Sequence, residues 1–565
     1  MLSRRLTSRL ISLLVVLIAA FSLVSGCSNT SGPEATDIPA PTASGASQTS
    51  GDQTAAPSDS EDSIDWTKYP IVTDGSVTLT AWWPTSNTYI TDPNETLPFI
   101  EGSKRTGIKW EFLVPSSGSE GEQFNLMIVS DEWPDLIKGF ASYYSKGLDN
   151  AIDEEIILPL EDYLYAMPAI DYWRNSSDLI KKSLTTDGGH FAGIPLILIG
   201  SQDHKAQGAY SGYGVRSDWL NNLGLKVPET YDELDAVLKA FQDAGYCEHP
   251  LELWPNADTY AIMAGHNIVS VMPFYGQIGG WLVDGNKVKY ALFEDNYKAY
   301  IKMLNEWCQK GYFENDYYTV NTFWNNALTK ASNNELGVFN FMYTWYGLFK
   351  STALDSTFDI EAMPVLRLNK TDKVHVRSES SGASIYACVT TQSTQPEMVC
   401  SYWNYFFTDE GILLGNYGVE GETFEYVNGE PKWMGRYDEL VAEHDSSYAQ
   451  GMLFIYLTPG FRWWDRELQV VGEKEKSFLK IWDSDAFTDS EYFYPSGATM
   501  TAEESQTYNN IMSDIGTLIS ENITQFIVGL RSMDEWDSFC EQIRSMGIEQ
   551  AQACKQSAFD RYQAR

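Results

Sequence analysis

The sequence predicts an α/β protein built from two lobes, and three observations support this. Strand, helix, strand, helix and strand patterns follow one another over residues 76–137, which favours a parallel sheet covered by helices. Helix and strand patterns alternate again over residues 230–366. Of the 565 residues, about 500 follow a polar N-terminal segment, more than one ordinary core accommodates. No repeat with a period of roughly 20–50 residues recurs, which argues against a solenoid or propeller.

The elements of the first half follow from their side-chain patterns. Residues 76–83 are rich in Val, Thr and Trp and stop at Pro84, which is typical of a strand. Residues 95–106 have a helical pattern, and residues 108–114 alternate between apolar and polar side chains, as a half-buried strand does. The remaining elements expected here are a helix over 120–130 and a short strand over 134–137.

The second half repeats these signals. Thr230 and Glu233 form a capping-box pattern, which predicts that a helix begins at 231 and runs to 244. Residues 335–341 and 359–366 are apolar runs expected to form buried strands. The alternation therefore continues into a second sheet.

The N-terminus has the pattern of an export signal. Residues 1–9 carry three arginines, residues 10–24 are apolar, and small residues lead into Cys27. This ending resembles the bacterial lipobox, whose cysteine is lipidated and becomes the first residue of the mature protein. The alternative is an uncleaved membrane anchor, but the apolar run is shorter than the ~20 residues a span needs. We therefore predict a signal peptide over 1–26 and a flexible Ser/Thr/Pro/Gly tether over 27–65.

Charge and cysteine usage exclude several functions. The formal net charge is −38, which disfavours binding to nucleic acid, although a local basic pocket could still hold an anionic ligand. The six other cysteines form no Cys-x-x-Cys pair, and the six histidines are widely spaced, so no metal site is indicated. No cofactor is expected; a structural calcium ion is possible, but no EF-hand spacing is visible.

Sequence signatures of catalysis do not stand out. The chain contains no His-Glu-x-x-His, Gly-x-Ser-x-Gly or Walker A sequence. A glycosidase needs two carboxylates at a fixed separation, and no carboxylate motif stands out among 77 acidic residues. The chain is therefore not expected to be an enzyme.

Four segments carry a family resemblance. Residues 122–137 contain an apolar helix and end in Pro134-Asp-Leu-Ile137, and residues 214–233 contain Arg216-Ser-Asp-Trp-Leu220 before Pro228. Together with 407–421 and 525–561, they resemble family 1 extracellular solute-binding proteins of ABC-type carbohydrate importers, in the long lipoprotein branch of Gram-positive bacteria. The resemblance covers nearly everything after residue 65.

This resemblance implies a two-lobed, periplasmic-binding-protein-like (type II) fold with a ligand cleft between the lobes. Hinge crossovers are expected near 208–215, 359–366 and 408–421. The expected lobes are 66–209 with 367–407, and 215–360 with 422–565.

Aromatic side chains at strand ends are the expected binding residues. Sugar rings present C–H faces that pack on aromatic rings, and their hydroxyl groups need fixed donors and acceptors. The chain has 18 Trp and 33 Tyr, and ligands of open α/β sheets bind at the carboxyl ends of strands. The predicted ligand-binding residues at strand ends are Trp83, Tyr143, Tyr144, Tyr343 and Trp345. The family resemblance adds Trp254, which follows a helix, and a dense aromatic and charged cluster adds Arg462, Trp463, Trp464 and Asp465.

Each of these residues has an alternative place in a core or a helix-packing patch. Trp82 and Trp83 are neighbours on one strand and point to opposite faces, so at least one of them is expected to be core.

The sequence thus favours a lipid-anchored receptor on the extracellular face of the cell membrane. Its expected partners are an oligosaccharide of several rings, the transmembrane subunits of an ABC permease and, through Cys27, the membrane. It is expected to be a monomer. An exported glycan-degrading enzyme and a receptor for a non-sugar ligand such as a peptide are the alternatives.

Overall fold

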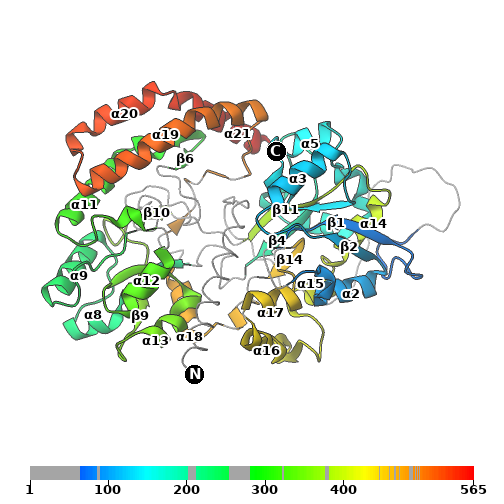
Figure 1. The fold of residues 1–565 in the computed structure, drawn as a ribbon, viewed down its shortest axis with the longest axis horizontal. Helices are drawn as coiled ribbons and strands as arrows, with labels where there is room; N and C mark the ends of the chain where they lie inside the picture. Colours follow the sequence, from blue (N-terminus) through cyan, green and yellow to red (C-terminus); the bar gives the residue numbers. More distant parts are fainter. Residues whose placement is uncertain are drawn as a thin grey trace.

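A computed structural model gives the fold. It describes residues 64–85, 90–200, 211–253, 280–320, 323–375, 381–444, 446–456, 458–463, 466, 468–469, 471–482, 488–489, 492, 494–495 and 497–565. Two sheets organise these residues into two lobes, drawn on the right and left of Figure 1. Alternating strands and helices build both lobes, which confirms the α/β, two-lobed fold predicted from the sequence.

The larger sheet contains six strands in the order β14-β4-β11-β3-β1-β2. All of them run parallel except β11, which is antiparallel to both of its neighbours. The carboxyl ends of the five parallel strands therefore meet at one edge. The strands are β1 (Thr78–Trp82), β2 (Lys109–Leu113), β3 (Leu136–Lys138), β4 (Ile194–Ile199), β11 (Ser381–Val389) and β14 (Gly460–Trp463).

The smaller sheet has the order β8-β5-β9, with both outer strands antiparallel to β5. The strands are β5 (Ser211–Arg216), β8 (Val338–Met342) and β9 (Ile360–Ala362). Leu251 adds a parallel bridge to Val338, which extends the sheet beyond β8. The chain enters this lobe through the segment between β4 and β5, so the amino end of β5 lies on the side of entry. Because β8 and β9 are antiparallel to β5, their carboxyl ends lie on the same side.

Helices cover both sheets. Those of the large-sheet lobe are α2 (Leu97–Thr106), α3 (Glu120–Ser130), α4 (Phe140–Tyr143), α5 (Leu148–Asp153), α6 (Pro168–Arg174), α7 (Asp178–Ser183), α14 (Pro396–Tyr405), α15 (Asp409–Tyr417), α16 (Arg436–Glu443) and α17 (Ser446–Leu453). Those of the small-sheet lobe are α8 (Ser217–Leu223), α9 (Tyr231–Asp243), α11 (Asp295–Gln309), α12 (Phe323–Ser332), α13 (Tyr346–Thr352), α18 (Glu473–Trp482), α19 (Ala502–Val528), α20 (Trp536–Ser545) and α21 (Ile548–Ala564).

Three two-stranded pairs complete the described strands. They are β6 (Trp281–Asp284) with β7 (Lys287–Tyr290), β12 (Phe424–Val427) with β13 (Glu430–Trp433), and β10 (Val374–His375) with β15 (Thr488–Asp489).

In the order of the described elements, the chain passes between the two lobes three times: between β4 and β5, between β9 and β11, and between β14 and α18. The first two passages lie beside the expected hinges at 208–215 and 359–366. The third differs from the expectation, because residues 408–421 contain α15 rather than a crossover. Strand β14 pairs with β4, so residues 422–463 pack in the large-sheet lobe instead of the second lobe.

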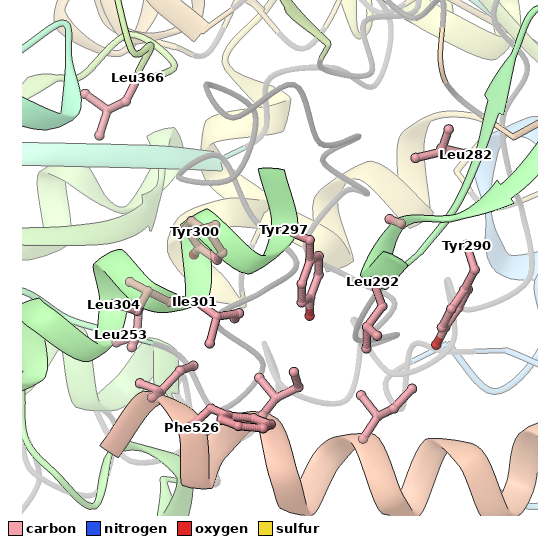
Figure 2. Close-up of a cluster of buried hydrophobic side chains, with 14 of the residues drawn as sticks. Leu253, Leu282, Tyr290, Leu292, Tyr297, Tyr300, Ile301, Leu304, Leu366 and Phe526 are labelled. Atoms are coloured by element: carbon pink, nitrogen blue, oxygen red, sulfur yellow. The ribbon is translucent and has the colours of Figure 1, made fainter. Parts of the chain in front are cut away.

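Each lobe buries its own core. In the small-sheet lobe, Tyr297, Tyr300, Ile301 and Leu304 recur at helical spacing and place one buried face of α11 against α19, where Phe526 lies (Figure 2). In the large-sheet lobe, Trp83, which follows β1, and rings from α2, β2 and α14 form an aromatic core around Trp403.

No helix among the described residues is long and apolar enough to cross a membrane.

Candidate functional site

The carboxyl edge of the large sheet is the first candidate region. Trp83 follows β1, Lys138 is the last residue of β3, and Trp463 is the last residue of β14. Because these strands are parallel and share one sheet, the three side chains start from the same edge. Trp83 and Lys138 also line one small cavity of about 50 Å³, together with Tyr456 and Thr458.

Trp83 is packed more tightly than a ligand platform requires. Its side chain is only 3 % exposed. Its ring stacks on Trp403 with centroids 5.7 Å apart and meets Phe99 and Phe112 edge-on, each at 5.4 Å. Trp83 therefore reaches the cavity as part of its aromatic wall, and its neighbour Trp82 is buried on the other face against Phe124.

Lys138 is a residue that sequence reasoning missed. Its ammonium donates a hydrogen bond to the Pro84 carbonyl oxygen at 2.9 Å and lies 5.0 Å from the centroid of the Trp83 ring. Burial of this ammonium lowers the pKa of Lys138 to about 7. The sequence signal that would have identified Lys138 is a lysine at the end of a short apolar strand, where the strand reaches the carboxyl edge of the sheet.

Tyr143 and Tyr144 follow β3 at the same edge. Tyr143 is partly exposed and packs against the rings of Trp82, at 5.2 Å, and Phe124, at 5.5 Å. Tyr144 is buried, and its hydroxyl donates to Glu154 Oε2 at 2.5 Å. Burial, followed by this bond to a carboxylate, raises the pKa of Tyr144, so the hydroxyl is held as a donor within the lobe.

Strand β14 carries two further predicted residues. Arg462 is buried, and its guanidinium lies 5.3 Å from the ring centroid of Tyr456. Trp463 is partly exposed, and its backbone N–H donates to Asn416 Oδ1 at 2.8 Å, which fixes the end of the strand. Of the predicted aromatic residues placed at this edge, Trp463 and Tyr143 are partly exposed, whereas Trp83 and Tyr144 are buried.

The carboxyl end of β8 is the second candidate region. Tyr343 and Trp345 lie in a short 3-10 helix, η6 (Tyr343–Trp345), which follows β8 directly. They are 3 % and 9 % exposed and belong to the same apolar cluster. The structure thus brings the predicted aromatic residues to the crossover side of two separate sheets. Trp254, Trp464 and Asp465 lie outside the described residues, as does Cys27.

A larger cavity, of about 320 Å³, lies in the small-sheet lobe beside the residues that precede position 254. Its walls come from the 246–253 segment, from 313–320 and from α12 and the turn after it. Glu252 is a buried wall residue, and the Asn340 backbone N–H donates to Glu252 Oε2 at 3.3 Å. Sequence reasoning did not single out this cavity, because its wall combines segments that are far apart along the chain.

Among the described residues, no group of three or more His, Cys, Asp or Glu side chains is placed to hold a metal ion. His190 contacts Glu161 Oε1 through Nδ1 at 2.5 Å. That contact raises the pKa of His190.

Comparison with known proteins finds two curated relatives that bind carbohydrates. No family model matches the chain. The fructooligosaccharide ABC transporter substrate-binding protein FusA of Streptococcus pneumoniae is 23 % identical over 509 residues, which cover 84 % of this chain and 88 % of that protein. The polygalacturonan/rhamnogalacturonan-binding protein YtcQ of Bacillus subtilis is 21 % identical over 342 residues, covering 58 % of this chain and 63 % of that one.

Solved structures of the same kind share the fold. A human-milk-oligosaccharide (HMO) binding solute-binding protein of an ABC transporter, from Bifidobacterium longum infantis, superposes with a TM-score of 0.70 at 16 % identity, covering 86 % of this chain and 99 % of that one. FusA in complex with kestose superposes with a TM-score of 0.65 at 21 % identity, with the same coverage.

The fold is therefore that of the two-lobed solute-binding proteins. Both sequence relatives are named as carbohydrate-binding proteins, and FusA as a substrate-binding protein of an ABC transporter, which agrees with the family resemblance drawn from the four sequence segments. FusA is named as the substrate-binding protein of an ABC transporter and YtcQ as a polysaccharide-binding protein; neither is named as an enzyme, which agrees with the expectation of a non-catalytic chain.

Proposed function

We propose that this chain is an extracellular solute-binding protein that captures an oligosaccharide between its two lobes and delivers it to an ABC importer. The match to the fructooligosaccharide receptor FusA, over 84 % of this chain, carries the proposal. Aromatic residues on the crossover side of both sheets support it, because a ligand held there would contact both lobes.

The binding mechanism follows from the chemistry of the two edges. A sugar ring lays its C–H face on an exposed aromatic ring such as Trp463, and buried donors and acceptors meet its hydroxyl groups. A ligand that contacts both lobes stabilises their closed arrangement by its higher affinity for that arrangement. The permease then recognises the closed, loaded form.

Lipidation at Cys27 would keep the receptor beside its permease. The 28–63 segment is composed almost entirely of small and polar residues and contains no aromatic ring. A flexible chain of this length has an r.m.s. reach of roughly 30–36 Å, so the lobes would stay within a few nanometres of the membrane. The high effective concentration of the tethered receptor favours docking.

A second candidate ligand is an acidic oligosaccharide, which Lys138 favours. Lys138 places an amino group with a pKa of about 7 at the carboxyl edge of the large sheet, and burial alone shifts this pKa, with no carboxylate of the described residues acting on it. A uronate carboxylate would pair with that ammonium. The relative YtcQ is described as a binder of such acidic polymers.

A calorimetric glycan panel tests the proposal and separates the two candidates. The panel contains kestose and longer fructooligosaccharides, neutral gluco-oligosaccharides, oligogalacturonides, free monosaccharides and short peptides. We expect 1:1 binding of an oligosaccharide, with weaker binding of monosaccharides and no product released during the titration. Selective binding of oligogalacturonides that falls at least tenfold in Lys138→Met would establish the acidic candidate.

Two outcomes contradict the proposed function. Tight binding of peptides together with no binding of any glycan would make the chain a receptor for a different ligand. Release of shorter sugars from the titrated oligosaccharide would make it an enzyme.

A further inference from the structure

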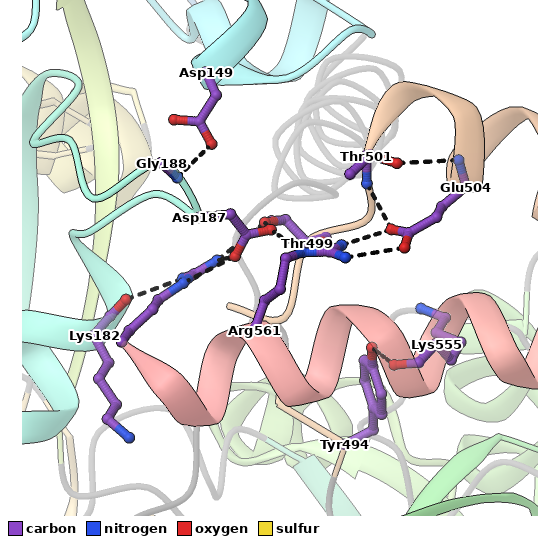
Figure 3. Close-up of polar contacts among 11 residues, drawn as sticks. Asp149, Lys182, Asp187, Gly188, Tyr494, Thr499, Thr501, Glu504, Lys555 and Arg561 are labelled. Carbon is purple, nitrogen blue, oxygen red and sulfur yellow. Dashed lines mark hydrogen bonds and ion pairs between the residues drawn. The ribbon is translucent and has the colours of Figure 1, made fainter.

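The two lobes meet at a place other than the crossovers. The final helix, α21, extends from the small-sheet lobe to a turn of the large-sheet lobe, where Asp187 receives two arginines (Figure 3). Arg561 Nε donates to Asp187 Oδ2 at 3.0 Å, and Arg565 Nη2 donates to Asp187 Oδ1 at 2.5 Å. Thr499, which precedes α19, adds a hydroxyl donor to Asp187 Oδ2 at 3.2 Å.

Further hydrogen bonds within each lobe fix Arg561 and the turn that carries Asp187. On the small-sheet side, Arg561 makes two bonds to Glu504 of α19, of 2.9 and 2.6 Å, so its guanidinium is fixed before it reaches Asp187. On the large-sheet side, the Gly188 N–H donates to Asp149 Oδ2 at 3.0 Å and ties the turn to α5. Gly189 continues the turn with a φ of 88°, which disfavours other residues.

The junction is more than a pair of exposed charges. The side chains of Arg565 and Asp187 are only 6 % and 15 % exposed, and Arg565 also donates to the Lys182 carbonyl oxygen at 3.2 Å. Isolated exposed ion pairs contribute at most about 1 kcal/mol, but networks with paired guanidinium–carboxylate bonds and low exposure contribute more. Hydrogen bonds to Glu504 raise the pKa of Arg561, so its guanidinium stays charged at neutral pH.

The junction lies far from the crossovers, and this distance limits how the lobes can rotate. All three crossovers leave the large sheet at one edge, while Asp187 precedes the opposite, amino end of β4. The six residues of β4 span about 20 Å, and a rotation of about 10° moves a point at that distance from the axis by roughly 3.5 Å. Such a displacement breaks hydrogen bonds of 2.5–3.2 Å unless the axis passes close to Asp187.

We propose that Asp187, Thr499, Glu504, Arg561 and Arg565 form an interlobe clasp, a fourth and non-covalent connection between the lobes. With the clasp closed, the two lobes can move relative to each other only by rotating about the line that joins the clasp to the crossovers. This inference concerns the ligand-free protein and does not depend on which solute the chain binds.

Interlobe distances test the clasp. Spin labels are attached to cysteines introduced by Val129→Cys on α3 and Leu354→Cys after α13, two positions that are 85 % and 75 % exposed. The full chain carries Cys27→Ser and Cys247→Ser, so that the partly exposed native thiol does not react. We expect one narrow distance distribution, which Asp187→Asn and Arg565→Met each widen at least about twofold.

Asp537→Asn is the matched control, because Asp537 pairs with Lys298 at 2.8 Å inside the small-sheet lobe. It is expected to leave the distribution unchanged. Arg565 belongs to neither apolar core, so Arg565→Met leaves the cores intact and keeps the test valid if Asp187→Asn fails to fold. Distributions of wild-type width in both clasp variants would overturn the proposal.

Discussion

At the scale of single residues, the structure separates two kinds of aromatic side chain that the sequence could not distinguish. Trp83 and Trp463 both end strands at the same sheet edge. Trp83 is buried among three rings, whereas Trp463 remains partly exposed. Position along a strand predicts the edge, but burial depends on neighbours such as Trp403 that lie more than 300 residues away.

This difference predicts opposite effects of two truncations. Trp83→Ala removes a packed ring from the core and is expected to lower the free energy of unfolding by about 3–5 kcal/mol. Trp463→Ala is expected to cost less than half as much, yet to weaken oligosaccharide binding at least tenfold. Urea unfolding and calorimetry measure the two quantities. The opposite result would be a Trp83→Ala variant that stays stably folded but loses oligosaccharide affinity, while Trp463→Ala keeps it. That result would make Trp83 the ligand-binding residue.

Lys138 predicts a pH dependence of stability. Its pKa falls from the ordinary lysine value of 10.5 to about 7 in the folded protein, because burial disfavours the charged form. Between these values the unfolded state binds the extra proton, so this residue makes folding more favourable as the pH rises from about 7. Lys138→Met removes that contribution.

The stability advantage of Lys138→Met over the wild type should therefore be largest near pH 6. It should shrink above pH 7 by at most about 1.4 kcal/mol per pH unit. Urea unfolding at pH 6, 7, 8 and 9 measures the difference, with the exposed Lys104→Met as the control. A difference that does not change with pH would show that the Lys138 ammonium is hydrated in the folded protein.

At the scale of elements, local sequence patterns located most helices and strands but not their partners. The expected helix over 120–130 is α3, and the expected strand over 108–114 contains β2. The third crossover was misplaced because the pairing of β14 with β4 joins residues more than 250 positions apart. Local periodicity carries no information about which sheet a distant strand joins.

Arg466 shows what holds this late segment in the large-sheet lobe. Its buried guanidinium donates to the Gly415 carbonyl oxygen at 3.0 Å and to the Ile455 carbonyl oxygen at 2.7 Å. Arg466→Met should leave both carbonyl groups without this donor and lower the free energy of unfolding by about 2–5 kcal/mol. The exposed Arg436→Met is the control, expected to cost less than about 0.5 kcal/mol. Equal stabilities of the two variants would contradict this role.

At the scale of the whole molecule, two lobes with separate cores are joined by three crossovers and by the proposed clasp. Two lobes with separate cores and a few connecting segments are the arrangement in which lobes rotate as rigid bodies. The family resemblance predicted the two lobes. The clasp could not be predicted, since its arginines and Asp187 lie more than 370 residues apart in the sequence.

Capture of an oligosaccharide between the lobes is the central claim. The most direct measurement is the distance between labels at positions 129 and 354 during titration with an oligosaccharide that calorimetry shows to bind. We expect a saturable change to a single, shorter distance at one oligosaccharide per chain, with the oligosaccharide recovered intact. An unchanged distance at full saturation would contradict the claim, because the ligand would then be bound within one lobe.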